Sequence, residues 1–238
     1  MISIYSEKAK KEEACTVTTF TNEERSTDVH IEKYIYVLVF DGMADWEPAI
    51  ALCELRRRGQ LSVVSVGFSK ESITTMGGLK VTPDITLSEI SHDNTLLLLL
   101  PGDEMWQKKK PEFRKYFNYI EILESMLIDF HKQGVPIAAI CGATITMARA
   151  GLLRSIRHTS NAPGFLDQFV PDYCNESDYV VDFAVRDGNI ITASGGGSVE
   201  FARLIIELLK IYPESQIEEW YQMFKCPKNS FSQLPNFQ

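Results

Sequence analysis

The stretch VPIAAICGATITMARAGLL, residues 135–153, decides the fold class of this 238-residue chain. It opens with a short continuous apolar run, VPIAAI (135–140), which is typical of a strand buried on both faces of a parallel sheet. The run leads directly through Cys141 and Gly142 into ATITMARAGLL, which we interpret as a helix. A strand that passes at once into a helix is the building unit of an α/β fold.

The same alternation of strand and helix recurs on both sides of this stretch. Further strands are expected at 34–40, 61–68 and 95–101, helices at 45–58, 112–133 and 198–212, and hairpins around Gly77-Gly78 and Asp187-Gly188. On the first helix, Trp46, Ile50 and Cys53 are expected to face inward, with Asp45 as the N-cap. The pattern predicts a mainly parallel sheet with helices on both faces.

The domain organisation predicted from composition is one domain with two irregular ends. Residues 1–32 are polar and mixed in charge, without an apolar period, and are interpreted as an N-terminal extension. Residues 33–226 form the expected single α/β domain, and residues 227–238 an irregular tail. With 45% hydrophobic residues, the chain is long enough for one substantial core.

Composition also excludes several function classes. The net charge of -8 argues against nucleic-acid binding, because phosphate backbones would be repelled. The five cysteines form no CxxC pair and no Cys/His cluster, which argues against a disulfide framework and a metal site. No segment has the apolar length of a signal peptide or a membrane span. We therefore expect a cytoplasmic protein with no membrane partner.

Polar or small-residue turns follow the carboxyl ends of the predicted strands. The first strand ends in FDGMADWE (40–47), the third in LPGDEMW (100–106) and the fourth in ICGAT (140–144). In an open parallel sheet, ligands bind beyond the carboxyl ends of the strands. The three loops are therefore expected to converge on one pocket.

Cys141 is the sharpest chemical signal in these loops. A cysteine between a buried strand and a helix start resembles a nucleophile elbow, in which the reactive atom is held on a strained turn. The positive end of the helix dipole favours a thiolate, which is the reactive form. Free cysteine is also among the residues most often buried in cores, so the residue pattern alone leaves a packing role open.

A family resemblance favours the reactive role. The segments VLVFDGMADWEPA, LLLLPGDEMW, PIAAICGATITMARAGLL, RHTSN and ITASGGGSVEFA, spanning about residues 34–212, resemble the ThiJ/PfpI superfamily, which includes the parkinsonism-associated protein deglycase. The resemblance implies a flavodoxin-like, class I glutamine amidotransferase-like fold. It also implies a homodimer and an activity that needs no metal or organic cofactor.

The resemblance further implies roles for particular residues. Cys141 would be the nucleophile, and Glu47 the acid whose carboxyl hydrogen-bonds its sulfur. The backbone N–H groups of Asp103 and Gly142 would form an oxyanion pocket. A helix N-terminus favours a carboxylate at Glu47, whereas a neighbouring thiolate favours the protonated acid, and we expect the thiolate to hold the charge in a dry site.

The sequence departs from the family where Cys-His members place their histidine. Asn161 occupies that position, and an amide cannot take the proton that a histidine would. His158 lies three residues earlier, which on an extended strand points it to the opposite face, so it would serve only if the segment bends. Glutamine amidotransferases also carry a His-x-Glu pair late in the chain; no such pair lies there in this sequence, so glutamine hydrolysis is not expected.

Three functions remain open at this point. The first is a cysteine-dependent hydrolase or lyase of protease, deglycase or glyoxalase type, acting through Cys141 on a small carbonyl, amide, glycated or peptide substrate. The second is a non-catalytic, redox-responsive protein in which Cys141 is oxidised to the sulfinic acid. The third is a binding module with an inert pocket.

Overall fold

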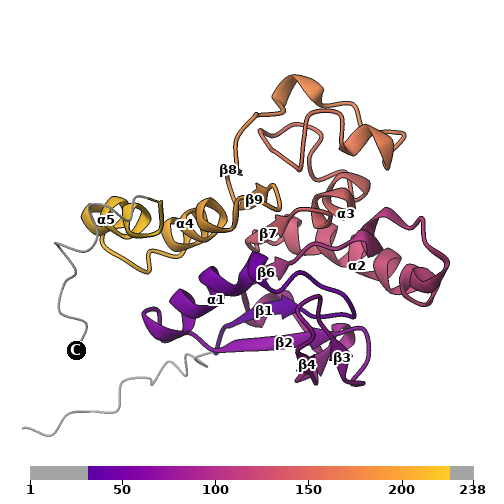
Figure 1. Ribbon diagram of the computed structural model, residues 1–238, viewed down its shortest axis with the longest axis horizontal. Coiled ribbons are helices and arrows are strands. Elements are labelled where there is room, and N and C mark those ends of the chain that lie inside the picture. Colours follow the sequence, from indigo (N-terminus) through magenta and orange to yellow (C-terminus); the bar gives the residue numbers. More distant parts are fainter. Residues whose placement is uncertain (1–31, 226–238) are drawn as a thin grey trace, which may run out of the picture. The chain divides into compact units, whose positions relative to one another are not determined.

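A seven-stranded sheet organises residues 32–225, the part of the chain that the computed structural model describes (Figure 1). The strand order is β5-β2-β1-β6-β7-β9-β8. The strands are β1 (Tyr34–Leu38), β2 (Val63–Gly67), β5 (Ile85–Thr86), β6 (Thr95–Leu100), β7 (Ile137–Ile140), β8 (Ala184–Asp187) and β9 (Ile190–Ala193). All pairs are parallel except β8 with β9, which confirms the predicted sheet. The predicted N-terminal extension and C-terminal tail lie outside the described residues, apart from residue 32.

Helices cover both faces of this sheet (Figure 1). Helices α1 (Trp46–Arg57), α4 (Ser198–Leu208) and α5 (Glu214–Lys225) pack on one face, and α2 (Phe117–Lys132) and α3 (Ala143–Arg149) on the other. The predicted hairpin at Gly77-Gly78 is present as the antiparallel pair β3 (Ile73–Thr74) and β4 (Lys80–Val81). Short 3-10 helices span Leu87–Glu89, His92–Asn94, Glu104–Gln107, Pro111–Tyr116, Leu166–Gln168 and Glu176–Asp178.

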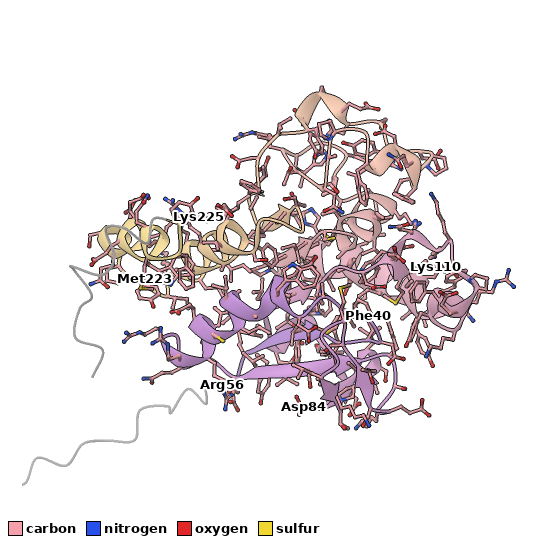
Figure 2. The ribbon with its side chains drawn as sticks, in the orientation of Figure 1. Phe40, Arg56, Asp84, Lys110, Met223 and Lys225 are labelled. Atoms are coloured by element: carbon pink, nitrogen blue, oxygen red, sulfur yellow. The ribbon has the colours of Figure 1, made fainter. Side chains whose placement is uncertain are left out.

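The apolar run of β6 shows why the buried strands are continuous hydrophobic segments in the sequence. Leu97 and Leu99 belong to the core beneath α1 and α4, whereas Leu98 and Leu100 belong to the core beneath α2 and α3. Successive side chains of a strand point to opposite faces, so a strand with helices on both sides needs an apolar residue at every position. Figure 2 shows Phe40, which follows β1, inside the domain, while Arg56, Asp84 and Lys110 lie at its periphery.

Helix α1 differs from the sequence prediction in the face that it buries. Trp46 is 53% exposed and Cys53 is exposed, so the prediction is wrong for these two residues, whereas Ile50 is partly buried and packs against the core. The buried stripe is Glu47, Pro48, Ala51, Glu54 and Leu55. Two glutamates lie on it because each accepts hydrogen bonds from other parts of the chain. Glu54, for example, accepts hydrogen bonds from Arg57 and Tyr212. Hydrophobic periodicity assigns such acids to the outside.

Other helix boundaries also differ from the predictions. Asp45 occupies the predicted N-cap position of α1, but its side chain makes no capping hydrogen bond, and its carboxylate accepts from the Gly77 N–H instead. The helix predicted over 112–133 is divided, since residues Pro111–Tyr116 form a 3-10 turn before α2 begins. Helix α5 was not predicted. It buries only Ile217 and Trp220, and so short an apolar stripe gives a weak periodic signal.

Because β6 is buried on both faces, two leucine truncations are expected to differ widely in their effect on the free energy of unfolding. Leu99→Ala removes a fully buried side chain from β6 and is expected to lower the free energy of unfolding by about 3 kcal/mol. Leu79→Ala makes the same change where the side chain is 63% exposed, and a loss of roughly 0.5 kcal/mol or less is expected. Urea denaturation of both variants measures these losses. Equal losses would contradict the packing described.

Candidate active site

The carboxyl ends of the parallel strands β1, β6, β7 and β9 lie at one edge of the sheet, and their loops meet there. A Cβ atom built on Gly102, after β6, would lie 2.5 Å from the Cβ of Cys141 and 2.8 Å from Glu47 Oε2. One built on Gly195, after β9, would lie 3.1 Å from Cys141 Sγ and 3.2 Å from Glu47 Oε1. Two glycines therefore leave the space in which the cysteine and the glutamate meet.

Neither Gly102 nor Gly195 was predicted as a site residue. Their signals are the Pro-Gly pair at 101–102 and the glycine run at 195–197, which are also ordinary marks of a turn. What makes glycine necessary here is a long-range contact. Any side chain at position 102 would overlap Cys141, which lies 39 residues further along the chain.

Cys141 has the backbone of the predicted elbow. Its φ angle is 58°, in the left-handed region that is strained for a residue with a Cβ. The Cys141 N–H donates to the Ala193 carbonyl at 2.8 Å, so β9 holds the turn from one side. Gly142 lets the Asp103 backbone approach closely, because a Cβ at position 142 would lie 2.3 Å from the Asp103 carbonyl oxygen. The sequence Cys-Gly therefore fits the turn at both positions.

Two buried hydroxyls hold the other side of the elbow. The Thr144 hydroxyl donates to the Cys141 carbonyl oxygen at 2.6 Å, and Thr144 Oγ1 lies 2.6 Å from Ser160 Oγ. Both side chains are buried. A buried hydroxyl without a partner is costly, so this pair is expected to fix the orientation of the Cys141 carbonyl. Thr144 and Ser160 were not predicted, because their roles depend on a contact between two separate loops.

Asn161 lies beside the sulfur. Its Nδ2 donates to Cys141 Sγ at 3.4 Å, while its Oδ1 accepts a hydrogen bond from the Gly195 N–H at 3.0 Å. The second bond orients the amide so that a donor faces the sulfur. Asn161 can therefore stabilise a negative sulfur, although it cannot accept the thiol proton.

Glu47 is nearly inaccessible, with 1% of its surface exposed. Its Oε2 accepts a hydrogen bond from the Gly102 N–H at 2.5 Å. Its Oε1 is buried and has no hydrogen-bond partner among residues 32–225. The Cys141 sulfur lies beside this carboxyl, because a Cβ built on Gly195 would lie 3.1 Å from Cys141 Sγ and 3.2 Å from Glu47 Oε1. The structure thus brings together the two side chains that the family resemblance pairs.

Burial has the largest effect on the pKa values of Glu47 and Cys141. It raises the pKa of Glu47 to about 7, against the lowering effect of the Gly102 N–H. Burial, followed by the negative charge of Glu47, raises the pKa of the Cys141 thiol to about 11, although Asn161 and the Gly142 N–H act to lower it. The glutamate therefore loses its proton first, and near pH 8 a carboxylate faces a neutral thiol.

This order is the reverse of the one predicted from the helix dipole. Helix α3 has only 7 residues, and the dipole of so short a helix is weak. Transfer of the sulfur into a dry environment penalises the thiolate more strongly than the dipole favours it. The thiol pKa is accordingly raised, not lowered.

The predicted oxyanion donors belong to residues next to the site, since Gly142 follows Cys141 and Asp103 follows Gly102 in the chain. The Asp103 N–H has no hydrogen-bond acceptor within the described range 32–225. The Gly142 N–H acts to lower the pKa of the Cys141 thiol. The Asp103 carboxylate instead caps the following 3-10 turn, accepting from the Met105 N–H at 2.6 Å. An oxyanion role for the two backbone groups stays a prediction.

His158 is buried away from this constellation. Its Nδ1 lies 2.8 Å from the Ile156 carbonyl oxygen and its Nε2 lies 2.6 Å from Tyr173 Oη. Because both ring nitrogens are engaged elsewhere, the structure does not bring His158 to Cys141. The segment does not bend as a catalytic role would require, and the ring instead supports the loop that carries Asn161.

Two tryptophans near the site have different roles. Trp106 is fully buried, packs edge-on against Phe40 and donates from Nε1 to the Pro101 carbonyl, so it supports the loop after β6. Trp46, which was predicted to face inward, lies at the rim of the site, where Nε1 donates to the Gly195 carbonyl at 3.3 Å.

Residues 32–225 contain neither a metal-binding cluster nor a membrane-spanning helix. No group of three or more His, Cys, Asp or Glu side chains there is arranged to hold a metal ion. Within the same range, no helix has the length and apolar character needed to cross a membrane.

The sequence is similar to a known protein family and to individual members of it. The DJ-1/PfpI family model matches residues 33–208. An uncharacterized protease of Bacillus subtilis, YoaZ, is 35% identical over 206 residues, covering 83% of this chain and 93% of the relative. A deglycase of Pyrococcus abyssi is 30% identical over 179 residues, covering 74% and 99% respectively.

Solved structures agree with this match. A thiJ/pfpI family protein from Bacillus anthracis superposes with a TM-score of 0.73 at 34% identity, covering 84% of this chain and 94% of that one. DJ-1beta of Drosophila melanogaster superposes with a TM-score of 0.60 at 27% identity, covering 82% of this chain and 97% of that one.

The hydroxyl contact at the elbow gives a second prediction. Thr144→Val removes the donor to the Cys141 carbonyl and leaves Ser160 without its partner, so the free energy of unfolding is expected to fall by about 2 kcal/mol. Thr144→Ser keeps the hydroxyl and should lose less than half as much. Thermal and urea denaturation measure both, and equal losses would exclude the hydroxyl as the cause.

The charge of Glu47 gives a third prediction. Because that charge helps to raise the pKa of the Cys141 thiol, Glu47→Gln is expected to shift the alkylation of Cys141 to lower pH by roughly one unit. The rate of iodoacetamide labelling of the Cys141 peptide, followed by mass spectrometry from pH 7 to 11, measures the shift. The exposed Cys53 serves as an internal control with an unchanged profile. A midpoint that stays in place or rises would refute this account.

Proposed function

Because this chain belongs to the DJ-1/PfpI family, we propose that it is a hydrolase or lyase that uses Cys141 as the nucleophile toward a carbonyl, amide or glycated substrate. The observation that carries the proposal is the buried contact between the Glu47 carboxyl and the Cys141 thiol on a strained turn. Strained backbone and ionisable groups with strongly shifted pKa values are both concentrated at functional sites.

The first step is attack of the sulfur on the substrate's carbonyl carbon. A bond forms between Sγ and that carbon while the electron pair of the C=O double bond moves to the oxygen. The thiol proton passes to the Glu47 carboxylate. A base with a pKa of about 7 suits this transfer near neutral pH, and no thiolate needs to accumulate beforehand.

The developing oxyanion then needs donors. The Asp103 N–H lacks an acceptor among the described residues, and the Gly142 N–H directly follows the nucleophile in the chain. Backbone donors that are fixed before the reaction stabilise such a charge without reorganisation. We assign the oxyanion to these two groups and the orientation of the sulfur to Asn161.

The second step depends on the substrate. With an amide, the C–N bond breaks, the nitrogen takes the proton from Glu47, and water then hydrolyses the acyl-cysteine to release the acid. With an aldehyde, protonation of the oxyanion gives a hemithioacetal. Two relatives at 35% and 30% identity are named a protease and a deglycase, which supports chemistry at a carbonyl carbon.

A redox role is the second candidate, and Asn161 favours it. An amide in place of a histidine leaves Glu47 as the sole proton acceptor in contact with the sulfur among the side chains described. The partly exposed sulfur could be oxidised to the sulfinic acid by a peroxide. The raised thiol pKa opposes this role, because the thiolate is the form that peroxides oxidise.

Turnover assays separate the two candidates. Consumption of methylglyoxal and hydrolysis of p-nitrophenyl acetate are expected to be lost in Cys141→Ala and to fall roughly 100-fold or more in Glu47→Gln. Cys53→Ala, which removes an exposed cysteine on α1, should leave both activities unchanged. In the wild type, kcat/KM should rise as pH increases through about 7, since the base must be ionised.

Two outcomes would contradict the proposed enzyme. The first is turnover that persists in Cys141→Ala. The second is a wild-type protein without turnover whose Cys141 gains two oxygen atoms in dilute hydrogen peroxide, as measured by mass spectrometry, which would support the redox role.

A further inference from the structure

A groove begins beside the nucleophile. It consists of two adjoining cavities of about 340 and 220 Å³, which share Pro163, Tyr179 and Val181 as lining residues. The near cavity also contains Asn161 and Ser194, and the far cavity extends to Asp167 and Glu176. The mechanism proposed above uses only Asn161 from this surface, so the remainder of the groove lacks a role.

We propose that this groove is a subsite for an extended peptide substrate that carries an apolar side chain near the reactive carbonyl and a basic side chain further along. The inference rests on the proposed function, because it takes Cys141 as the reacting group. It goes further by selecting a peptide among the possible carbonyl and amide substrates.

Continuity with the sulfur is the first argument. Asn161 lines the near cavity and also donates to Cys141 Sγ at 3.4 Å. Ser194, another lining residue, directly precedes Gly195, where an added Cβ would lie 3.1 Å from the sulfur. A substrate whose carbonyl carbon lies at the sulfur can therefore extend past Asn161 into the groove.

Exposed apolar side chains are the second argument. In the near cavity, Val181 is 80% exposed and Phe183 is 51% exposed. Phe183 is held in place, because its carbonyl accepts from the Ser194 N–H at 2.9 Å and Lys225 lies over its ring at 5.0 Å. Neighbouring large apolar groups left in solvent commonly mark a binding surface. A fixed one beside a nucleophile suits an apolar substrate side chain.

Charge is the third argument. Asp182 lines the near cavity, and Asp167 and Glu176 line the far one, whereas no lysine or arginine lines either. Asp167 and Glu176 take part in no ion pair with the residues between 32 and 225. The far end of the groove is therefore negative and uncompensated, which is complementary to a lysine or arginine side chain.

Size favours a peptide over a small carbonyl compound. The near cavity alone falls within the range of about 300–1,000 Å³ that is usual for ligand pockets. A three-carbon aldehyde would fill little of it and would gain nothing from the far cavity. An extended chain has a side chain about every 3.3 Å and can contact both cavities at once.

The test compares peptides with a substrate too small for the groove. Two fluorogenic peptide amides are used, each with leucine at the cleaved bond and either lysine or glutamate three residues away. The wild type is expected to prefer the lysine peptide by about tenfold or more in kcat/KM. The double variant Asp167→Lys/Glu176→Lys should abolish or invert this preference while hydrolysis of p-nitrophenyl acetate stays unchanged.

Matched controls separate local charge from net charge and fold. Glu71→Lys/Glu219→Lys makes the same change in net charge at exposed positions outside the groove and should keep the preference. Val181→Ser, at an exposed position, should lower kcat/KM for both peptides by about tenfold and leave the acetate ester unaffected. Fluorescence anisotropy of the labelled peptides on Cys141→Ala measures the same preferences as affinities, without turnover.

The outcomes for the two proposals differ. If p-nitrophenyl acetate is hydrolysed through Cys141 but the groove variants leave peptide preference and affinity unchanged, the subsite is refuted and the proposed function stands. If the wild type turns over neither methylglyoxal, the ester nor the peptides, the proposed function fails and the subsite fails with it. If the groove variants instead change the oligomeric state in sedimentation, the groove is a contact between copies, which also overturns the subsite.

Discussion

The left-handed backbone of Cys141 is the constraint on which the site depends. A non-glycine residue in this region costs on the order of 1–3 kcal/mol, so the conformation persists only where its surroundings impose it. Here β9 accepts the Cys141 N–H, the Thr144 hydroxyl binds its carbonyl, and Gly142 lets the next loop approach. The buried strands supply the stability that offsets this strain.

A dry environment then determines the chemistry. The same burial that holds Cys141 against Glu47 raises the pKa of both groups, so the pair avoids carrying two charges near neutral pH. This arrangement favours transfer of a proton at the moment of attack over a thiolate formed in advance. Asn161 fits that scheme, because it orients the sulfur and leaves the proton to the carboxyl.

Sequence patterns predicted the fold better than they predicted the face of α1. The leucines of β6 are apolar at every position because helices cover both faces of the sheet, and that signal is local. The buried face of α1 carries Glu47 and Glu54, whose partners lie elsewhere in the chain. Hydrophobic periodicity assigns acids to the solvent-exposed face of a helix, so it predicted that Trp46 and Cys53 face the core.

The sequence by itself determined the strand-helix alternation, the cysteine elbow and the loops that form the site, because these depend on neighbouring residues and on strand direction. Tertiary structure decided which atoms meet there. Glycines at 102 and 195, the Thr144–Ser160 pair and the direction of the pKa shifts depend on contacts between loops that are distant in sequence. Desolvation is likewise a property of the folded surroundings, and it outweighed the helix dipole that local sequence suggested.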